Sequence, residues 1–222
     1  MSAQDAVFNR AFGAFLFDMD GTVLNSIAAA ERIWAAWAER HGVDVETFLP
    51  TIHGVRAIDT ITRLNLPGVD AEAQAAFITE AEIEDVEGIV EIPGAAAFLK
   101  SLPANQWAMV TSAPRDLALR RMAAAGIPEP AVMITAEDVS AGKPDPAGYR
   151  LAARRLGLDP VDCLIFEDAT VGIQAAEAAG APLMIITATH QHPVETRHAT
   201  IASYCDVKLS IDSDGQLRLQ PQ

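Results

Sequence analysis

The sequence predicts an α/β protein: a doubly wound, Rossmann-like parallel sheet that carries a small all-helical cap domain inserted after the first strand. Three observations support this fold class. The apolar run at 15–17 is typical of a strand that is buried on both faces of a parallel sheet. Helical patterns then fill the chain to about Val90. From Pro93-Gly94 onward, helix and strand patterns alternate, as they do in βα units.

The segment after the first strand is predicted to be helical because its apolar residues recur every three or four positions. Its first helix can be capped by Asn25 or Ser26 and ends near Gly42. Trp34 and Trp37 share the apolar face of this helix, which indicates a core position. The acidic cluster at 80–87 is interpreted as a solvated helix face. We therefore expect the α/β core at 1–27 and 92–222, and the cap domain at 28–91.

The later elements follow from the alternating patterns. Helices are predicted at 95–102, 114–125, 146–156 and 171–179, and strands at 107–111, 132–135, 163–166 and 183–187. Asp214-Gly215 separates two short apolar stretches, which predicts a hairpin near the end of the chain.

Composition restricts the classes of partner. The 222 residues carry a net charge of −14, which argues against nucleic acid or an anionic membrane as the main partner. The first 15 residues lack a basic region followed by an apolar stretch, and no run approaches the length of a membrane span. Of the two cysteines, Cys163 is interpreted as a small buried apolar residue rather than a disulfide partner. We expect a reduced, cytoplasmic protein that is a monomer or weak dimer.

Polar residues stand where the predicted strands end. They are Asp18 and Asp20 after the first strand, Thr111 and Ser112 after the next, Lys143 in the loop SAGKPDP, and Glu167 and Asp168 in FEDA. Since the carboxyl ends of parallel strands meet at one edge of a sheet, these side chains should lie together. One like-charge pair at 4 Å costs about 4 kcal/mol at an effective dielectric of 20. Four carboxylates against one lysine therefore predict a hard divalent cation, Mg²⁺, at this edge.

Such a group of residues suits phosphate chemistry. An aspartate can attack phosphorus, and a second carboxyl group can protonate the leaving alcohol and later activate water. Lys143, Thr111 and backbone N–H groups around Gly21 would hold the phosphate oxygens.

The motifs DMDGT, VTSA, GKPDP and FEDA, in this order, resemble those of the haloacid dehalogenase superfamily of phosphotransferases. The resemblance covers about residues 12–209, and the helical insertion looks like the small cap of that family. IHGVRAIDTI and TAEDVSAGKPDP look most like bacterial phosphatases of small sugar and sugar-alcohol phosphates.

The resemblance implies a role for each matching residue. Asp18 would be the nucleophile and Asp20 the general acid and base, while Thr111 would bind phosphate and Lys143 would stabilise both phosphate and nucleophile. Mg²⁺ would be bound by Asp168, by the Asp18 side chain and by the Asp20 backbone carbonyl. Glu167 would orient a metal-bound water or ligate weakly.

Other residues in these motifs are candidates for substrate binding: Gly21, Ser112, His53 and Arg56. The stretch around His53 and Arg56 is either a turn between cap helices or a substrate loop. Two departures from the family pattern are Asn25, where members often carry Asp, and Pro114, which removes a backbone N–H.

Two alternatives to a phosphatase remain open. One is a mutase of the β-phosphoglucomutase type, although the stretch IAAAERIW lacks the histidine usual in that branch. The other is a phospho-accepting signalling domain, although such domains are smaller and place the acceptor on a middle strand. A dehalogenase needs no second aspartate, so Asp20 argues against that activity.

Overall fold

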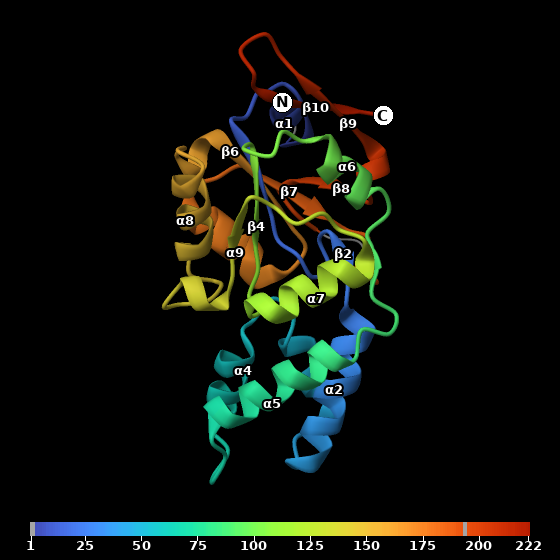
Figure 1. The fold of residues 1–222 in the computed structure, drawn as a ribbon, viewed down its shortest axis with the longest axis vertical. Coiled ribbons are helices and arrows are strands. Elements are labelled where there is room, and N and C mark those ends of the chain that lie inside the picture. Colours follow the sequence, from blue (N-terminus) through green and yellow to red (C-terminus); the bar gives the residue numbers. More distant parts are fainter. Residues whose placement is uncertain (1–2, 193–194) are drawn as a thin grey trace.

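Six parallel strands form the central sheet of the computed structural model, which describes residues 3–192 and 195–222 (Figure 1). Their order across the sheet is β5 (Val132–Ile134), β4 (Trp107–Val110), β1 (Ala14–Phe17), β6 (Cys163–Glu167), β7 (Leu183–Ile186) and β8 (Ala199–Ile201). After β1, the chain adds β4 and β5 on one side of this strand. It then adds β6, β7 and β8 on the other side. The predicted doubly wound fold is confirmed, and its direction switches between β1 and β6.

Helices cover both faces of this sheet. α6 (Ala95–Ser101) and α7 (Arg115–Ala125) pack with one hydrophobic cluster, and α8 (Ala147–Arg155) and α9 (Thr170–Ala179) pack with the other. Strand β1 contributes to both clusters, because successive side chains of a strand point to opposite faces. Phe15 and Phe17 join the first cluster and Leu16 joins the second. This two-sided burial explains the continuous apolar run in the sequence.

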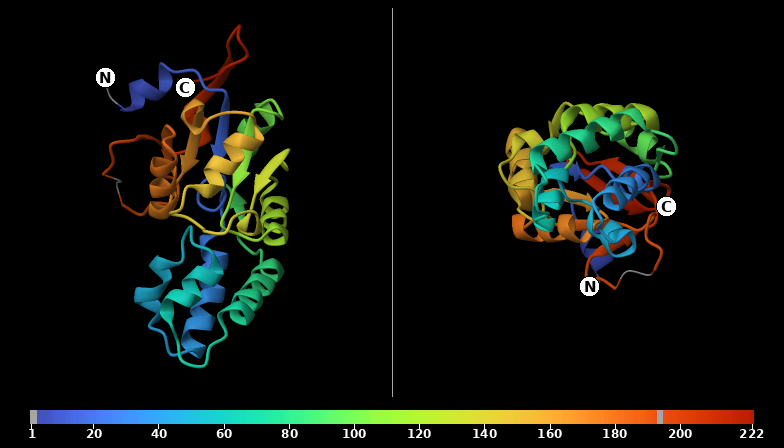
Figure 2. Two further views of the ribbon diagram at one scale, coloured as in Figure 1. Left: turned by 90° about the vertical axis from the view of Figure 1, so that its left-hand side faces the viewer. Right: turned by 90° about the horizontal axis from the view of Figure 1, so that it is seen from below.

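A helical segment lies beyond the carboxyl ends of the strands, at the opposite end of the molecule from both termini (Figures 1 and 2). It contains α2 (Ile27–Arg40), α3 (Val45–Phe48), the 3₁₀ helix η1 (Leu49–Thr51), α4 (Ala57–Leu64) and α5 (Ala71–Glu84). These helices enclose a separate hydrophobic cluster in which Trp34 and Trp37 are buried, as the sequence predicted. The division into a core and a cap domain at the expected boundaries stays a prediction.

The chain enters and leaves the helical segment at one place. β2 (Leu24–Asn25) pairs antiparallel with β3 (Val90–Glu91), and the Ile92 N–H donates to the Val23 carbonyl at 3.0 Å. The helical pattern was expected to reach Val90, but the chain is extended there because this pairing satisfies its backbone groups.

The remaining elements lie outside the six-stranded sheet and the helical segment. They are α1 (Ala3–Phe8), the antiparallel hairpin β9 (Val207–Ile211) and β10 (Leu217–Pro221), and the 3₁₀ helices η2 (Ala136–Asp138), η3 (Pro160–Asp162) and η4 (Tyr204–Asp206). The hairpin confirms the prediction from Asp214-Gly215. Within residues 3–192 and 195–222, the structure contains no helix with the length and apolar character needed to cross a bilayer.

Candidate active site

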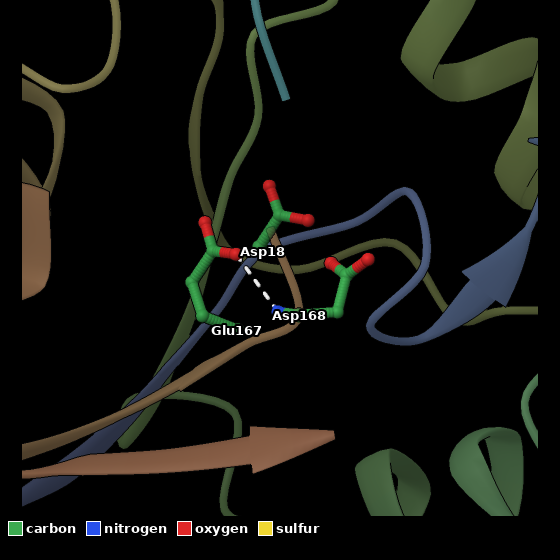
Figure 3. Close-up of side chains that lie close together, drawn as sticks. All are labelled: Asp18, Glu167 and Asp168. Atoms are coloured by element: carbon green, nitrogen blue, oxygen red, sulfur yellow. Dashed lines mark hydrogen bonds between the residues drawn. The ribbon is translucent and has the colours of Figure 1, made fainter. Parts of the chain in front are cut away.

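Three carboxylates meet where β1 and β6 end, at the switch point of the sheet. Asp18 follows β1, and its backbone N–H still donates to the Phe166 carbonyl of β6 at 3.0 Å. Glu167 is the last residue of β6, and Asp168 follows it. Figure 3 shows the three side chains converging, and one oxygen from each lies within 4.8 Å of the others. The sequence therefore predicted correctly that these residues lie together.

Lys143 supplies the positive charge at this point. Its ammonium group contacts Asp18 Oδ1 and lies 2.7 Å from Glu167 Oε1, and its side chain is only 6% exposed. Burial alone would lower the pKa of Lys143, but the charges of Asp18 and Glu167 more than offset this, so that its pKa is raised. Lys143 is therefore charged at neutral pH.

The carboxylates remain crowded despite Lys143. Burial raises the pKa of Asp18 to about 7, in spite of the neighbouring Lys143, and Glu167 adds to the shift. Burial and the charges of Glu167 and Asp18 raise the pKa of Asp168 well above its usual value. A divalent cation would relieve this repulsion, and a cluster of carboxylate oxygens without His or Cys suits Mg²⁺. The residues present therefore fit the predicted metal.

Two glycines make room for the carboxylates. A Cβ added to Gly172, on α9, would lie 1.5 Å from Glu167 Oε1. A Cβ added to Gly21 would lie 2.0 Å from Asp168 Oδ2, and Gly21 also has a positive φ of 89°. Gly21 thus allows Asp168 to approach the end of β1, which is a structural reason for the glycine in DMDGT.

Glu167 is fully buried and its oxygens are occupied by donors. Besides Lys143, the Tyr149 hydroxyl donates to Oε1 at 2.9 Å, and the backbone N–H groups of Asp168 and Ala169 donate to Oε2 at 2.8 and 3.0 Å. The Asp168 side chain accepts a hydrogen bond from the Thr22 hydroxyl, to Oδ1 at 3.0 Å. In this arrangement Glu167 orients Lys143, and Asp168 keeps an oxygen for a cation.

Asp20 lies beside this group and has different partners. The Ser26 hydroxyl donates to Asp20 Oδ1 at 2.5 Å, and the Arg121 guanidinium donates to the same oxygen at 2.9 Å. Arg121, on α7, also pairs with Glu82 on α5 at 3.1 Å. The interpretation of the acidic cluster as a solvated face was wrong for Glu82, which is buried against Arg121.

A pocket lies between the sheet edge and the helical segment. Asp18, Asp20, Thr111, Ser112 and Asp168 line it from the sheet, and Trp34, His53, Thr79 and Glu82 line it from the helical segment. The Thr111 hydroxyl accepts from the Ala113 N–H at 3.0 Å, and the Ser112 hydroxyl donates to the Gly54 carbonyl at 2.8 Å. The pocket therefore combines carboxylates and hydroxyls from both parts of the chain.

The two candidates from the helical segment differ in position. His53 lines the pocket, and its Nε2 lies 3.1 Å from Glu31. Arg56 is outside the lining of this pocket. Its guanidinium donates to both oxygens of Asp59, at 2.6 and 2.9 Å, and to the carbonyls of Val139 and Ser140. Arg56 thus ties the helical segment to the loop that carries Lys143, and its role in substrate binding stays a prediction.

Sequence reasoning did not identify Arg121 or Glu82 as part of the site. A signal for each was present. Arg121 follows Leu117 by four positions on the buried face of α7, and Glu82 follows the buried Ile78 by four positions on α5. A charged residue on an apolar helix face requires a partner, so this pattern marks both residues.

Comparison with known proteins adds independent evidence. Residues 12–180 match the model of the haloacid dehalogenase-like hydrolases. The chain is 41% identical to hexitol phosphatase A of Escherichia coli K12, over 81% of this chain and 85% of that protein. It is 37% identical to validoxylamine A 7'-phosphate phosphatase of Streptomyces hygroscopicus, over 79% and 85% respectively. A solved structure from Thermotoga maritima, provisionally assigned as a β-phosphoglucomutase, superposes with a TM-score of 0.61 at 27% identity, over 85% of this chain and 93% of that one.

Proposed function

The chain belongs to the haloacid dehalogenase-like hydrolases and is a phosphatase, and we propose that it hydrolyses a small sugar or sugar-alcohol phosphate with Mg²⁺, through an aspartyl phosphate on Asp18. The observation that carries the proposal is the buried contact of Asp18 with Lys143 beside Asp168 in a polar pocket. The names of the relatives support a polyhydroxylated substrate.

The first half of the reaction transfers the phosphoryl group to the protein. Because Lys143 contacts Asp18 Oδ1, the other oxygen of Asp18 is the one available to attack phosphorus. The bond between phosphorus and the alcohol oxygen breaks, and Asp20 gives its proton to that oxygen. Thr111 and Lys143 stabilise the charge on the phosphoryl oxygens.

The second half releases phosphate and restores the protein. Asp20, now a carboxylate, takes a proton from a water molecule that attacks the aspartyl phosphate. The bond between phosphorus and Asp18 breaks, and Asp20 is protonated again for the next cycle. Mg²⁺ would be held by Asp18, Asp168 and the Asp20 carbonyl, and it would supply the positive charge that lets a carboxylate and a phosphate approach.

The helical segment would act as a cap domain at residues 28–91 on a core at 1–27 and 92–222. Its contribution to the pocket, through residues such as His53 and Glu82, would select the alcohol portion and exclude water during phosphoryl transfer. Ser112 would support this cap through its hydrogen bond to Gly54. We also expect a cytoplasmic monomer or weak dimer.

The test is phosphate release from a panel of sugar and polyol phosphates, with Mg²⁺ and with a chelator. We expect turnover that the chelator abolishes and that Asp18→Asn removes. Asp214→Asn makes the same chemical change on the exposed tip of the terminal hairpin and should leave turnover intact. Turnover by Asp18→Asn at the parent rate would show that the nucleophile is assigned wrongly.

Two other outcomes would favour the alternatives. An isomerised sugar phosphate formed in the presence of a bisphosphorylated sugar would indicate a mutase, which the Thermotoga maritima structure brings into consideration. A long-lived phosphoprotein without release of phosphate would indicate a phospho-accepting signalling domain.

A further inference from the structure

Arg121 is a charged side chain buried at the boundary between the sheet and the helical segment. Its side chain is only 7% exposed, because it lies on α7 among the core residues Leu117, Ala118 and Met122. A buried guanidinium is tolerated only where carboxylates compensate it. Two do so: Nη1 donates to Asp20 at 2.9 Å, and Nη2 lies 3.1 Å from Glu82. Arg121 therefore links two carboxylates that come from different parts of the chain.

The contact with Asp20 distinguishes the two oxygens of that carboxylate. Both Ser26 and Arg121 donate to Oδ1, and no donor to Oδ2 is present among residues 3–192 and 195–222. These two donors hold Oδ1 in place. Oδ2 is consequently the oxygen that is available for proton transfer, in a side chain that lines the pocket beside Asp18.

Glu82 determines where the guanidinium can lie. It comes from α5 of the helical segment, whereas Arg121 comes from α7 of the α/β part. The two are paired because α5 lies against α7 (Figure 1). Glu82 is itself buried, with a side chain only 9% exposed, which limits its freedom to move. Glu82 thus holds the guanidinium through Nη2, and the guanidinium holds Asp20 through Nη1.

We propose that Arg121 is a positioning residue for Asp20, and that Glu82 fixes Arg121 so that the helical segment contributes to proton transfer without touching the reacting atoms. This inference rests on the proposed function, in which Asp20 protonates the leaving alcohol. It adds two residues outside the four sequence motifs to the machinery of that step. A misplaced acid slows the reaction most when the leaving group needs its proton.

The leaving group therefore provides the test. A polyol alkoxide must be protonated as it leaves, whereas nitrophenolate leaves readily as an anion. We would compare a polyol phosphate with p-nitrophenyl phosphate, following single-turnover release of the alcohol or phenol so that the later hydrolysis of the aspartyl phosphate does not contribute. The variants are Arg121→Met, Arg121→Lys and Glu82→Gln. The matched controls are Arg120→Met and Glu84→Gln, which change exposed neighbours on the same helices.

For Arg121→Met we expect polyol release to fall about 100-fold and nitrophenolate release to fall less than about threefold. Arg121→Lys should recover at least about tenfold of the loss, since it restores a charged donor, and Glu82→Gln should cost about tenfold. KM for the polyol phosphate should change less than about threefold, and the control variants should match the parent.

Three results would overturn the inference. An equal fall for both substrates would mean that Arg121 only maintains the structure. A raised KM with unchanged kcat would mean that Arg121 or Glu82 binds substrate directly. Parent-like rates in all three variants would mean that Asp20 needs no such support. If Arg121→Met does not fold, the comparison of substrates in Arg121→Lys and Glu82→Gln decides. Failure of the proposed function is a separate result, because the parent itself would then release no phosphate.

Discussion

Gly172→Ala tests how tightly the buried carboxylate of Glu167 is packed. Alanine normally stabilises a helix relative to glycine, by about 1 kcal/mol. Here the new Cβ would lie 1.5 Å from Glu167 Oε1, so the carboxylate must retreat by roughly 2 Å to reach an ordinary contact distance. That movement breaks the hydrogen bonds of Oε1 with Lys143 and Tyr149.

The expected magnitude follows from these contacts. Each hydrogen bond to a charged group contributes about 2 kcal/mol, and strain in a packed interior adds about 1–3 kcal/mol. After subtraction of the helix preference, we expect Gly172→Ala to lower the free energy of unfolding by about 5 kcal/mol. For a chain of this length, the midpoint of thermal unfolding should fall by about 15 °C. Activity should fall as well, because Glu167 orients Lys143.

Urea unfolding, followed by tryptophan fluorescence, would measure the effect. Gly148→Ala is the matched control, since Gly148 also lies in a helix but its Cβ would meet only the Val110 side chain at 3.0 Å and Ile134 at 4.0 Å. Its free energy of unfolding should change by less than about 1 kcal/mol. A Glu167→Ala background lacks the carboxylate that the new Cβ would meet, so Gly172→Ala should become stabilising there. Equal effects of Gly172→Ala and Gly148→Ala would refute the reasoning.

Three further predictions concern the metal, the cysteines and an ion pair. Mg²⁺ at 100 times its Kd should raise the free energy of unfolding by about 2.7 kcal/mol, seen as a higher thermal midpoint that Asp168→Asn abolishes. Burial raises the pKa of Cys163 to about 12, so a thiol reagent should modify one cysteine in the native protein and two in urea. Against the effect of burial, hydrogen bonds from Thr135 and Arg155 hold the pKa of Asp138 below its usual 3.8. The stabilising contribution of Asp138 is therefore complete above pH 3.8, and it is lost as the pH falls through the lower pKa of the folded state. In urea unfolding, the difference in free energy between Asp138→Asn and the parent should be smaller at pH 3 than at pH 7.

The carboxylate cluster could be predicted because it depends on topology. Once β1 and β6 are assigned as parallel strands, Asp18 and Asp168 must emerge at one edge, whatever the details of packing. Crowding of negative charge then follows from residue identity alone, and it adds to the effect of burial, which is the main cause of the raised pKa values of both groups. The resemblance in the four motifs led to the same residues independently.

The contacts between the helical segment and the sheet could not be predicted in this way. They depend on how two separately packed parts meet, and helix periodicity describes only one helix at a time. The contacts of Arg56 with Asp59 and with backbone carbonyls of the Lys143 loop were not predicted, and its role in substrate binding stays a prediction. Glu82 was grouped with exposed acidic neighbours, because its burial depends on Arg121 from a distant segment. The strands β2 and β3 were missed because two residues carry too little pattern, and β8 was also missed.

The antiparallel pairing of β2 with β3 has a consequence for how such chains can diversify. Because the helical segment starts and finishes at neighbouring residues, an entirely different insertion of any length could be spliced between Asn25 and Val90 without altering the register of the six-stranded sheet. The insertion could then change substrate preference while the residues of the sheet edge that transfer the phosphoryl group stay the same. An exception is Arg121, whose partner Glu82 would be exchanged along with the insertion.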